Sequence, residues 1–452
     1  MKPGRRYGLS SVVFFLHVIV HFWVVVFATT SAGTTETNSD EFQYKTLSQM
    51  WNALRGLVEA FPELARLEFV GNVSGATVYS LILSKQAHRR MFLMPRVRLA
   101  SDFPAGSEIL IHFASSLLFE YSKSEEVAKL LNTTEVHVLF WLHGYKIPEA
   151  SNEECVKDDG TYHVQFLELD FDEASQGAVQ PEARLLKRWF RSQRFLLGAA
   201  LHAGNELSVN YGFSNKKDGA PVPAPDEDVL SEISSAYVDS NQAMRQSNKS
   251  CPRGRTSTPI SRKHVSMTMQ EYTYTSEGTL EILLSISCCI VPSNLSALWQ
   301  ENKESLLNSL LQADHGVRGY VKTTDGTLVA KALITIKGRN VAFWTSDQGE
   351  FFRILPPGDY VALVASKGYL PAKSSFRVPS QKWAEPVIVT LVEAYAPVNV
   401  KPAPQMALDP TTATEKDDPS PSGSKAGFLV VRRKFIVVIA LLQLVVSMDY
   451  DY

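Results

Sequence analysis

Histidines are the first residues to consider for chemistry, because neutral imidazole is the commonest protein ligand for metals. The chain has ten of them, and none is followed by a glutamate three residues later. His202 stands out because it closes the apolar stretch FLLGAALH within residues 180–204, QPEARLLKRWFRSQRFLLGAALHAG. The four cysteines contain no C-x-x-C pair, so a cysteine-based zinc site is not predicted.

Acidic side chains gather in the stretch FLELDFDE. Glu168, Asp170 and Asp172 alternate along it, with Glu173 beside them, and this spacing would place three carboxylates on one face of a strand. Such a row could form a pocket for a cationic ligand or for calcium. A charge run of this kind is more often a solvated loop, which is the prediction we adopt.

Motifs of other enzyme classes are absent from the sequence. There is no G-x-S-x-G, no P-loop and no G-x-G-x-x-G after a strand. The formal charge of −2, from 45 basic and 47 acidic residues, offers no electrostatic argument for a nucleic-acid partner.

The N-terminal residues predict a secretory signal peptide, residues 1–32. Lys2 and Arg5 precede an apolar run over residues 12–27, and small residues up to Ala32 provide a cleavage site. A transmembrane anchor is the alternative, but the run is short. We therefore expect a protein of the secretory pathway, extracellular or at the cell surface. Four N-x-S/T sequons are candidate glycosylation sites, at Asn72, Asn132, Asn248 and Asn294.

Disulfides are expected in such a compartment. Cys288 and Cys289 are adjacent, and neighbouring residues rarely reach the geometry of a mutual bond. Cys251 is therefore predicted to pair with Cys288 or Cys289. The state of Cys155 stays open, because it could bond the other member of the pair or remain a free thiol.

Alternating helices and strands predict an α/β domain over residues 42–312, with a mixed, largely parallel sheet flanked by helices. Apolar residues at three- and four-residue spacing predict the first helix between Tyr44 and Phe61. Asp226 and Ser293 are candidate caps of later helices. The remaining helices are expected over 108–121 and 181–192, and strands over 67–70, 78–83, 136–142, 195–201 and 280–290.

The pattern changes at Gly316, where short alternating runs separated by turns predict a small β-sandwich over residues 315–394. Residues 395–426 are rich in Pro, Ser and Thr and predict a stalk. Residues 427–452 hold an apolar run shorter than the about 20 residues of a membrane span. A lipid-anchor signal, a short membrane segment and a soluble tail all remain open.

The chain resembles the carboxypeptidase E/N/D/M subfamily of zinc carboxypeptidases, and carboxypeptidase D in particular. The resemblance rests on residues 180–204 together with APDEDVL, MQEYTYTSEGTLEILLSISCC, GVRGYVKTTDG and DQGEFFRILPPGDYVALVASKGY. It covers about residues 42–393. It implies a zinc-carboxypeptidase-like α/β domain followed by a transthyretin-like sandwich, and an enzyme that removes C-terminal Lys or Arg from peptides.

The resemblance also implies that the catalytic residues are missing. The family takes two zinc ligands from H-x-x-E, and Ala100 and Phe103 occupy those positions, so that only His202 is retained. Ser285 occupies the position of the glutamate that activates water. The remaining family positions, which bind substrate or steady the developing oxyanion, fall on Glu168, Leu169, Thr161, Lys263 and Ser214.

These substitutions predict a pseudoenzyme without a cofactor that binds an unknown peptide or protein. One alternative is an active metallocarboxypeptidase with displaced ligands, in which His143 or His163 joins His202 and Asp170 at a zinc ion. A second alternative is an adhesive or structural surface protein that acts through its β-sandwich.

Overall fold

The computed structural model describes residues 42–96, 104–142, 155–156, 169–172, 179–204, 206–214, 221–246, 253–259, 267–289, 291–339, 341–380 and 385–394. The predicted signal peptide, stalk and C-terminal segment lie outside these residues. Within the described residues, no helix is both long and apolar enough to cross a membrane.

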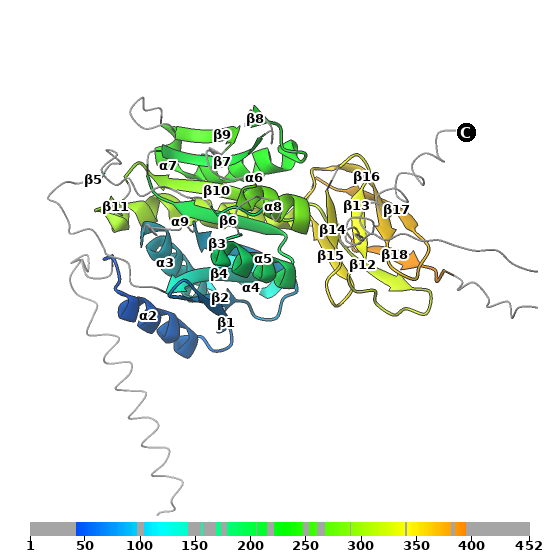
Figure 1. The fold of residues 1–452 in the computed structure, drawn as a ribbon, viewed down its shortest axis with the longest axis horizontal. Helices are drawn as coiled ribbons and strands as arrows, with labels where there is room; N and C mark the ends of the chain where they lie inside the picture. Colours follow the sequence, from blue (N-terminus) through cyan, green and yellow to red (C-terminus); the bar gives the residue numbers. More distant parts are fainter. Residues whose placement is uncertain are drawn as a thin grey trace, which may run out of the picture. The chain divides into compact units, whose positions relative to one another are not determined.

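The described part of the first domain contains a nine-stranded mixed sheet (Figure 1). Its strands are β1 Ala65–Val73, β2 Ala76–Leu83, β3 Arg89–Pro95, β4 Thr134–Leu142, β6 Leu197–His202, β7 Glu206–Ser214, β8 Pro221–Val222, β9 Arg253–Pro259 and β10 Leu280–Ser287. The order is β1-β2-β4-β3-β6-β10-β7-β8, with β9 pairing with β7. Strands β4, β3, β6 and β10 run parallel in the centre, and antiparallel pairs extend the sheet on both sides.

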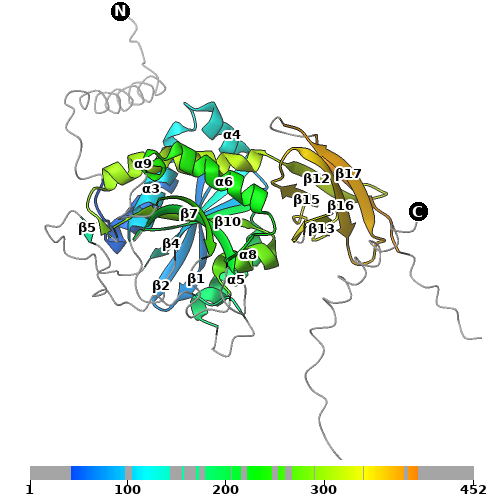
Figure 2. The same cartoon turned by 90° about the horizontal axis from the view of Figure 1, so that it is seen from above.

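Helices cover both faces of this sheet (Figure 2). They are α2 Leu47–Ala60, α3 Pro104–Glu120, α4 Glu125–Thr133, α5 Pro181–Gln193, α6 Glu227–Ser240, α7 Gln242–Arg245, α8 Met269–Glu277 and α9 Leu295–Leu311. Helices α2, α3, α4, α6 and α9 bury their apolar sides in the larger core cluster, while α5 packs into a second cluster on the opposite face. The predicted α/β class with a mixed, helix-flanked sheet is confirmed.

Local sequence signals account for several helix ends. Thr46 and Thr268 each form a capping box at the start of α2 and α8. Pro181 occupies the first turn of α5, as predicted. The cap of α9 is Asn294 rather than the predicted Ser293, because the Asn294 side chain accepts the Ala297 N–H at 2.9 Å. The sequence patterns do not predict strands β3, β7, β8 and β9 or helices α4, α7 and α8.

Strand β6 lies at the centre of the sheet, and every one of its residues is buried. Gly198 in this strand leaves room for the ring of Phe92, because a Cβ at position 198 would lie 2.1 Å from two ring carbons. The Phe92 ring is itself surrounded by Trp189, Phe190 and Phe195. The ring therefore has little room to move away.

We expect Gly198→Ala to lower the free energy of unfolding by about 1–3 kcal/mol, the usual cost of overpacking a core. Urea denaturation followed by tryptophan fluorescence would measure the change. The control is Gly56→Ala on α2, where a Cβ meets nothing within 4 Å, so this variant should gain up to about 1 kcal/mol. Equal stability of the two variants would contradict the assigned packing.

The second domain is a β-sandwich with a core of its own. Its strands are β12 Val317–Thr323, β13 Leu333–Ile336, β14 Ala342–Trp344, β15 Glu350–Arg353, β16 Gly358–Ala365, β17 Ala372–Val378 and β18 Val387–Leu391. They form one sheet in the order β15-β12-β18 and another in the order β14-β13-β16-β17. Alternating buried and exposed residues along β12 and β13 direct one side of each strand into the core, as predicted.

Buried ion pairs join the two domains. Asp226, which is 0% exposed, accepts hydrogen bonds from Arg339 and Arg353 of the sandwich. Asp228 adds a bidentate pair with Arg339, at 2.9 and 2.7 Å. These residues are called the Asp226 cluster below. Asp226 precedes α6 as predicted, but its side chain makes no cap hydrogen bond, because both carboxylate oxygens face arginines.

Candidate functional site

His202 and Ser285 come together at the ends of two central strands. His202 is the last residue of β6, and the parallel register of β6 and β10 places Ser285 opposite it. The Ser285 hydroxyl lies 3.3 Å from Nε2 of His202. His202 and Ser285, the residues that the resemblance places at a zinc-ligand and at the base position, are therefore neighbours.

Glu206 completes this group. It is the first residue of β7, which runs antiparallel to β10 beside Ser285. The Ser285 hydroxyl donates a hydrogen bond to Oε1 of Glu206 at 3.1 Å. Sequence reasoning missed Glu206, since only the pairing of β7 with β10 brings it to Ser285. His202, Ser285 and Glu206 are called the β6–β10 group below.

The β6–β10 group does not have the geometry of a catalytic triad. In a triad the carboxylate orients the imidazole, which accepts the serine proton. Here the carboxylate of Glu206 accepts the serine hydroxyl instead, and Ser285 is 0% exposed. A buried hydroxyl whose proton is directed at a carboxylate is not placed to attack a substrate.

The donors of this group also do not fit a catalytic zinc site. Protein ligands of zinc are His, Cys, Asp and Glu, and a catalytic site needs three of them around an open position. The group supplies one imidazole and one carboxylate, and the Ser285 hydroxyl makes a hydrogen bond with each of them. Among the described residues, no cluster of three or more His, Cys, Asp or Glu side chains could hold a metal ion. Ala100, Phe103, His143 and His163 lie outside the described residues.

The predicted substrate-binding positions are only partly described. Leu169 is buried in the second core cluster, where an apolar side chain packs well. Ser214 ends β7, and its backbone pairs with Pro221. The other three positions, Glu168, Thr161 and Lys263, lie outside the described residues.

Asp170 orders the chain around it. Its Oδ1 accepts the backbone N–H of Asp172 at 2.9 Å and that of Met267 at 3.1 Å. Its own N–H donates to the Gln180 side chain at 3.1 Å. A carboxylate with these two backbone donors on one oxygen ties two distant segments together. Asp170 is buried in this role, so the prediction of a solvated loop is wrong at this residue.

Glu281 lies on strand β10, four residues before Ser285. It is buried, and its Oε2 accepts a hydrogen bond from the Thr273 hydroxyl at 2.6 Å. Burial raises the pKa of the Glu281 carboxyl to about 7, although the Thr273 hydrogen bond and the charge of Arg96 act in the opposite direction.

The cysteines and sequons bear on the expected compartment. Cys288 and Cys289 are both disulfide-bonded, and no described cysteine is free. Asn72, Asn132 and Asn294 are exposed. Asn248 and Cys251 lie outside the described residues, and of Cys155 only the backbone, in β5 (Cys155–Val156), is described.

Comparison with known families identifies the two domains. Residues 149–305 match the zinc carboxypeptidase family, and residues 316–392 match the carboxypeptidase regulatory-like domain. The chain is a carboxypeptidase-family protein. The family is zinc-dependent, and the resemblance stated from the sequence is confirmed.

Curated relatives of this carboxypeptidase-family protein include Carboxypeptidase D of Drosophila melanogaster. The two are 28% identical over 355 residues, which cover 72% of this chain and 25% of the relative. Carboxypeptidase Z of Mus musculus is 26% identical over 416 residues, covering 81% of this chain and 64% of the relative. This chain thus spans about a quarter of the first relative's length. The solved structure of thrombin activatable fibrinolysis inhibitor is 12% identical at a TM-score of 0.44, covering 62% of this chain and 77% of that one.

Proposed function

We propose that this carboxypeptidase-family protein is a pseudoenzyme of the secretory pathway that holds no catalytic zinc and binds a peptide or protein. The observation that carries the proposal is the β6–β10 group. At the predicted position of the water-activating glutamate stands Ser285, whose hydroxyl contacts the one retained ligand histidine. The absence of H-x-x-E from the whole sequence supports the same conclusion.

The chemistry of these residues supports the loss of activity. A serine hydroxyl ionises far above neutral pH, so it cannot act as a general base that takes a proton from water. His202 by itself offers one ligand where a catalytic zinc site needs three. The described sheet and helices nevertheless bury two hydrophobic clusters, and a scaffold with a packed core but without catalytic groups suits a binding role.

The zinc content of the protein tests this proposal. We expect less than about 0.1 zinc per chain in protein purified without chelators or metal-affinity resin, because a single imidazole binds zinc weakly. Inductively coupled plasma mass spectrometry would measure the metal. One zinc per chain, together with removal of C-terminal Lys or Arg from a test peptide, would establish the active alternative with displaced ligands.

A restored variant provides the matched control. Ala100→His with Phe103→Glu supplies the two missing ligand types, and Ser285→Glu supplies the base. The triple variant is expected to take up about one zinc per chain under the conditions that leave the natural protein empty. Zinc uptake by the variant alone would show that the assay detects the site and that the natural side chains are the reason for its loss.

A further inference from the structure

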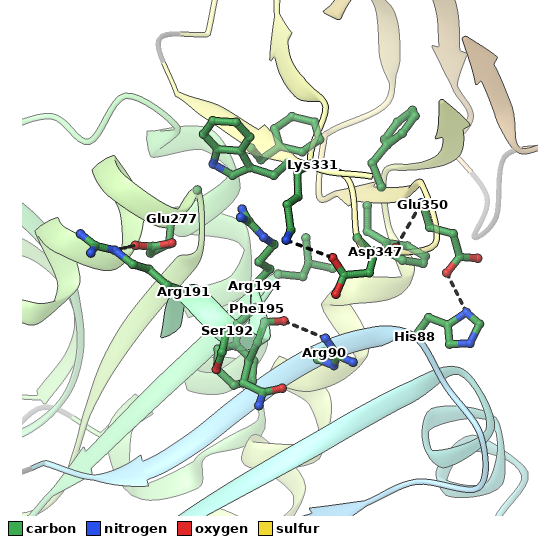
Figure 3. Close-up of a pocket in the computed structure, with 18 residues that line it drawn as sticks. His88, Arg90, Arg191, Ser192, Arg194, Phe195, Glu277, Lys331, Asp347 and Glu350 are labelled. Atoms are coloured by element: carbon green, nitrogen blue, oxygen red, sulfur yellow. Dashed lines mark hydrogen bonds and ion pairs between the residues drawn. The ribbon is translucent and has the colours of Figure 1, made fainter. Parts of the chain in front are cut away.

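A cavity of about 340 Å³ lies between the α/β domain and the β-sandwich (Figure 3). No residue of the β6–β10 group lines it. The end of α5 lines one side, through Arg191 and Arg194. The sandwich lines the other, through Lys331, Trp344 and Asp347. Its size and its place at a domain junction are those of a small-molecule site.

Positive charge is concentrated in this pocket, but most of it is already paired. Arg191 lies 3.4 Å from Glu277, and Arg90 lies 2.7 Å from Glu135. These pairs hold the walls of the pocket in place. Arg194 differs, because among the described residues it has no carboxylate within ion-pair distance.

Arg194 instead lies over an aromatic ring of the other domain. Its guanidinium carbon is 5.3 Å from the centre of the Trp344 ring. Stacking holds the planar group in one orientation while leaving its N–H donors available at the edge. In Figure 3, Arg194 and Lys331 enter the same space from the two domains.

Lys331 has only a weak partner. Its Nζ lies 3.7 Å from Asp347, and the side chains of this pair are 65% and 75% exposed. An exposed pair at that distance contributes little stability, so an incoming anion can compete with Asp347 for the ammonium group. The pocket therefore offers one guanidinium and one ammonium group to a ligand.

The backbone at both cations is strained. The described residues contain three non-glycine residues at positive φ, and two of them are Arg194 at 53° and Lys331 at 56°. The left-handed conformation costs roughly 1–2 kcal/mol for most non-glycine residues. At Arg194 it also ends helix α5, where a left-handed residue is common. The third such residue, Ser74, lies in the β1–β2 turn and does not line the pocket.

We propose that this pocket binds a small ligand through a dianionic tetrahedral oxyanion group, such as a phosphomonoester. Two cations from different domains match two negative charges, and a guanidinium fork fits the oxygen atoms of a phosphate group. The cavity has room for this group with a small organic remainder. Nothing in this proposal depends on zinc or on peptide binding at the β6–β10 group.

Titration of the full chain with inorganic phosphate tests the proposal, at pH 8 and constant ionic strength, by isothermal calorimetry. Saturable binding is expected for the natural protein. Arg194→Gly and Lys331→Gly should each weaken it about tenfold or more, because each removes a charge-assisted hydrogen bond. Asp347→Asn should tighten it, since the competing carboxylate is gone.

The glycine variants separate binding from folding. Glycine adopts positive φ without strain, so Arg194→Gly should leave the melting temperature equal or higher while binding is lost. Ser74→Gly relieves the same kind of strain elsewhere and should bind phosphate as the natural protein does. A melting temperature that falls in Arg194→Gly with unchanged phosphate affinity would show that Arg194 only packs on Trp344, and would overturn the proposal.

Two further ligands identify the source of the oxyanion. Glycerol phosphate binding more tightly than inorganic phosphate would support a phosphomonoester ligand, and sulfate binding equally well would support a tetrahedral dianion in general. The absence of saturable binding of all three ligands to the natural protein would refute the site.

Discussion

The Asp226→Asn variant is expected to lose about 3–5 kcal/mol of unfolding free energy, the cost of leaving buried charges without their partner. Asparagine keeps the shape of the side chain but replaces one acceptor oxygen with an NH2 donor, so the charge and one hydrogen bond from an arginine are lost together. In the natural protein Asp226 is 0% exposed and faces both Arg339 and Arg353. After the substitution, the Arg353 guanidinium, which is 2% exposed, stays buried without its carboxylate.

Asp228→Asn is the matched control for this prediction. Asp228 binds the same Arg339, but its side chain is 53% exposed. Its loss should cost about 0–1 kcal/mol, as for other exposed ion pairs. Guanidinium chloride unfolding of the full chain would measure both variants, and losses of similar size would mean that burial does not set the strength of the Asp226 cluster.

The second large effect is a pH dependence of stability that disappears in Glu281→Gln. The pKa of the Glu281 carboxyl is about 7 in the folded chain, against an ordinary value of 4.5. The folded state thus binds more protons than the unfolded state between these two values, so stability falls as pH rises through this range. The raised pKa of Glu281 contributes about 3 kcal/mol to the free energy of unfolding. This contribution is present in full below pH 4.5 and is lost above pH 7.

Urea unfolding at several pH values between 4 and 8 would measure this effect. The difference in stability between the natural protein and Glu281→Gln should change by about 3 kcal/mol across the range, whatever the other carboxyl groups contribute. Glu304→Gln, an exposed position on α9, is the control and should follow the natural protein. A constant difference for Glu281→Gln would show that the pKa of this carboxyl is the same in the folded and unfolded chain.

Much of the fold could be predicted from local patterns. Helices α2 and α5 follow from apolar spacing and from the proline that begins α5, and β6 follows from an unbroken apolar run. The sequence resemblance supplied the order of the two domains. Strand β3 was missed because its residues, RRMFLMP, carry two arginines and no turn signal before them.

The site could be predicted only in part, because its contacts join distant residues. The resemblance singles out Ser285 and His202 separately, but the contact of Ser285 with Glu206 depends on how β7 pairs with β10. Asp226 reads locally as a helix cap, yet its partners lie 113 and 127 residues further along the chain. No local pattern reveals whether such a carboxylate caps its helix or forms an ion pair with distant arginines.

The Asp226 cluster has a consequence for swapping domains between relatives. A β-sandwich from another carboxypeptidase-family protein could replace this one only if it brought arginines equivalent to both Arg339 and Arg353. A graft without them would place an uncompensated carboxylate at the junction. The two domains must therefore change together, and chimeras should be designed by matching this junction before matching their surfaces.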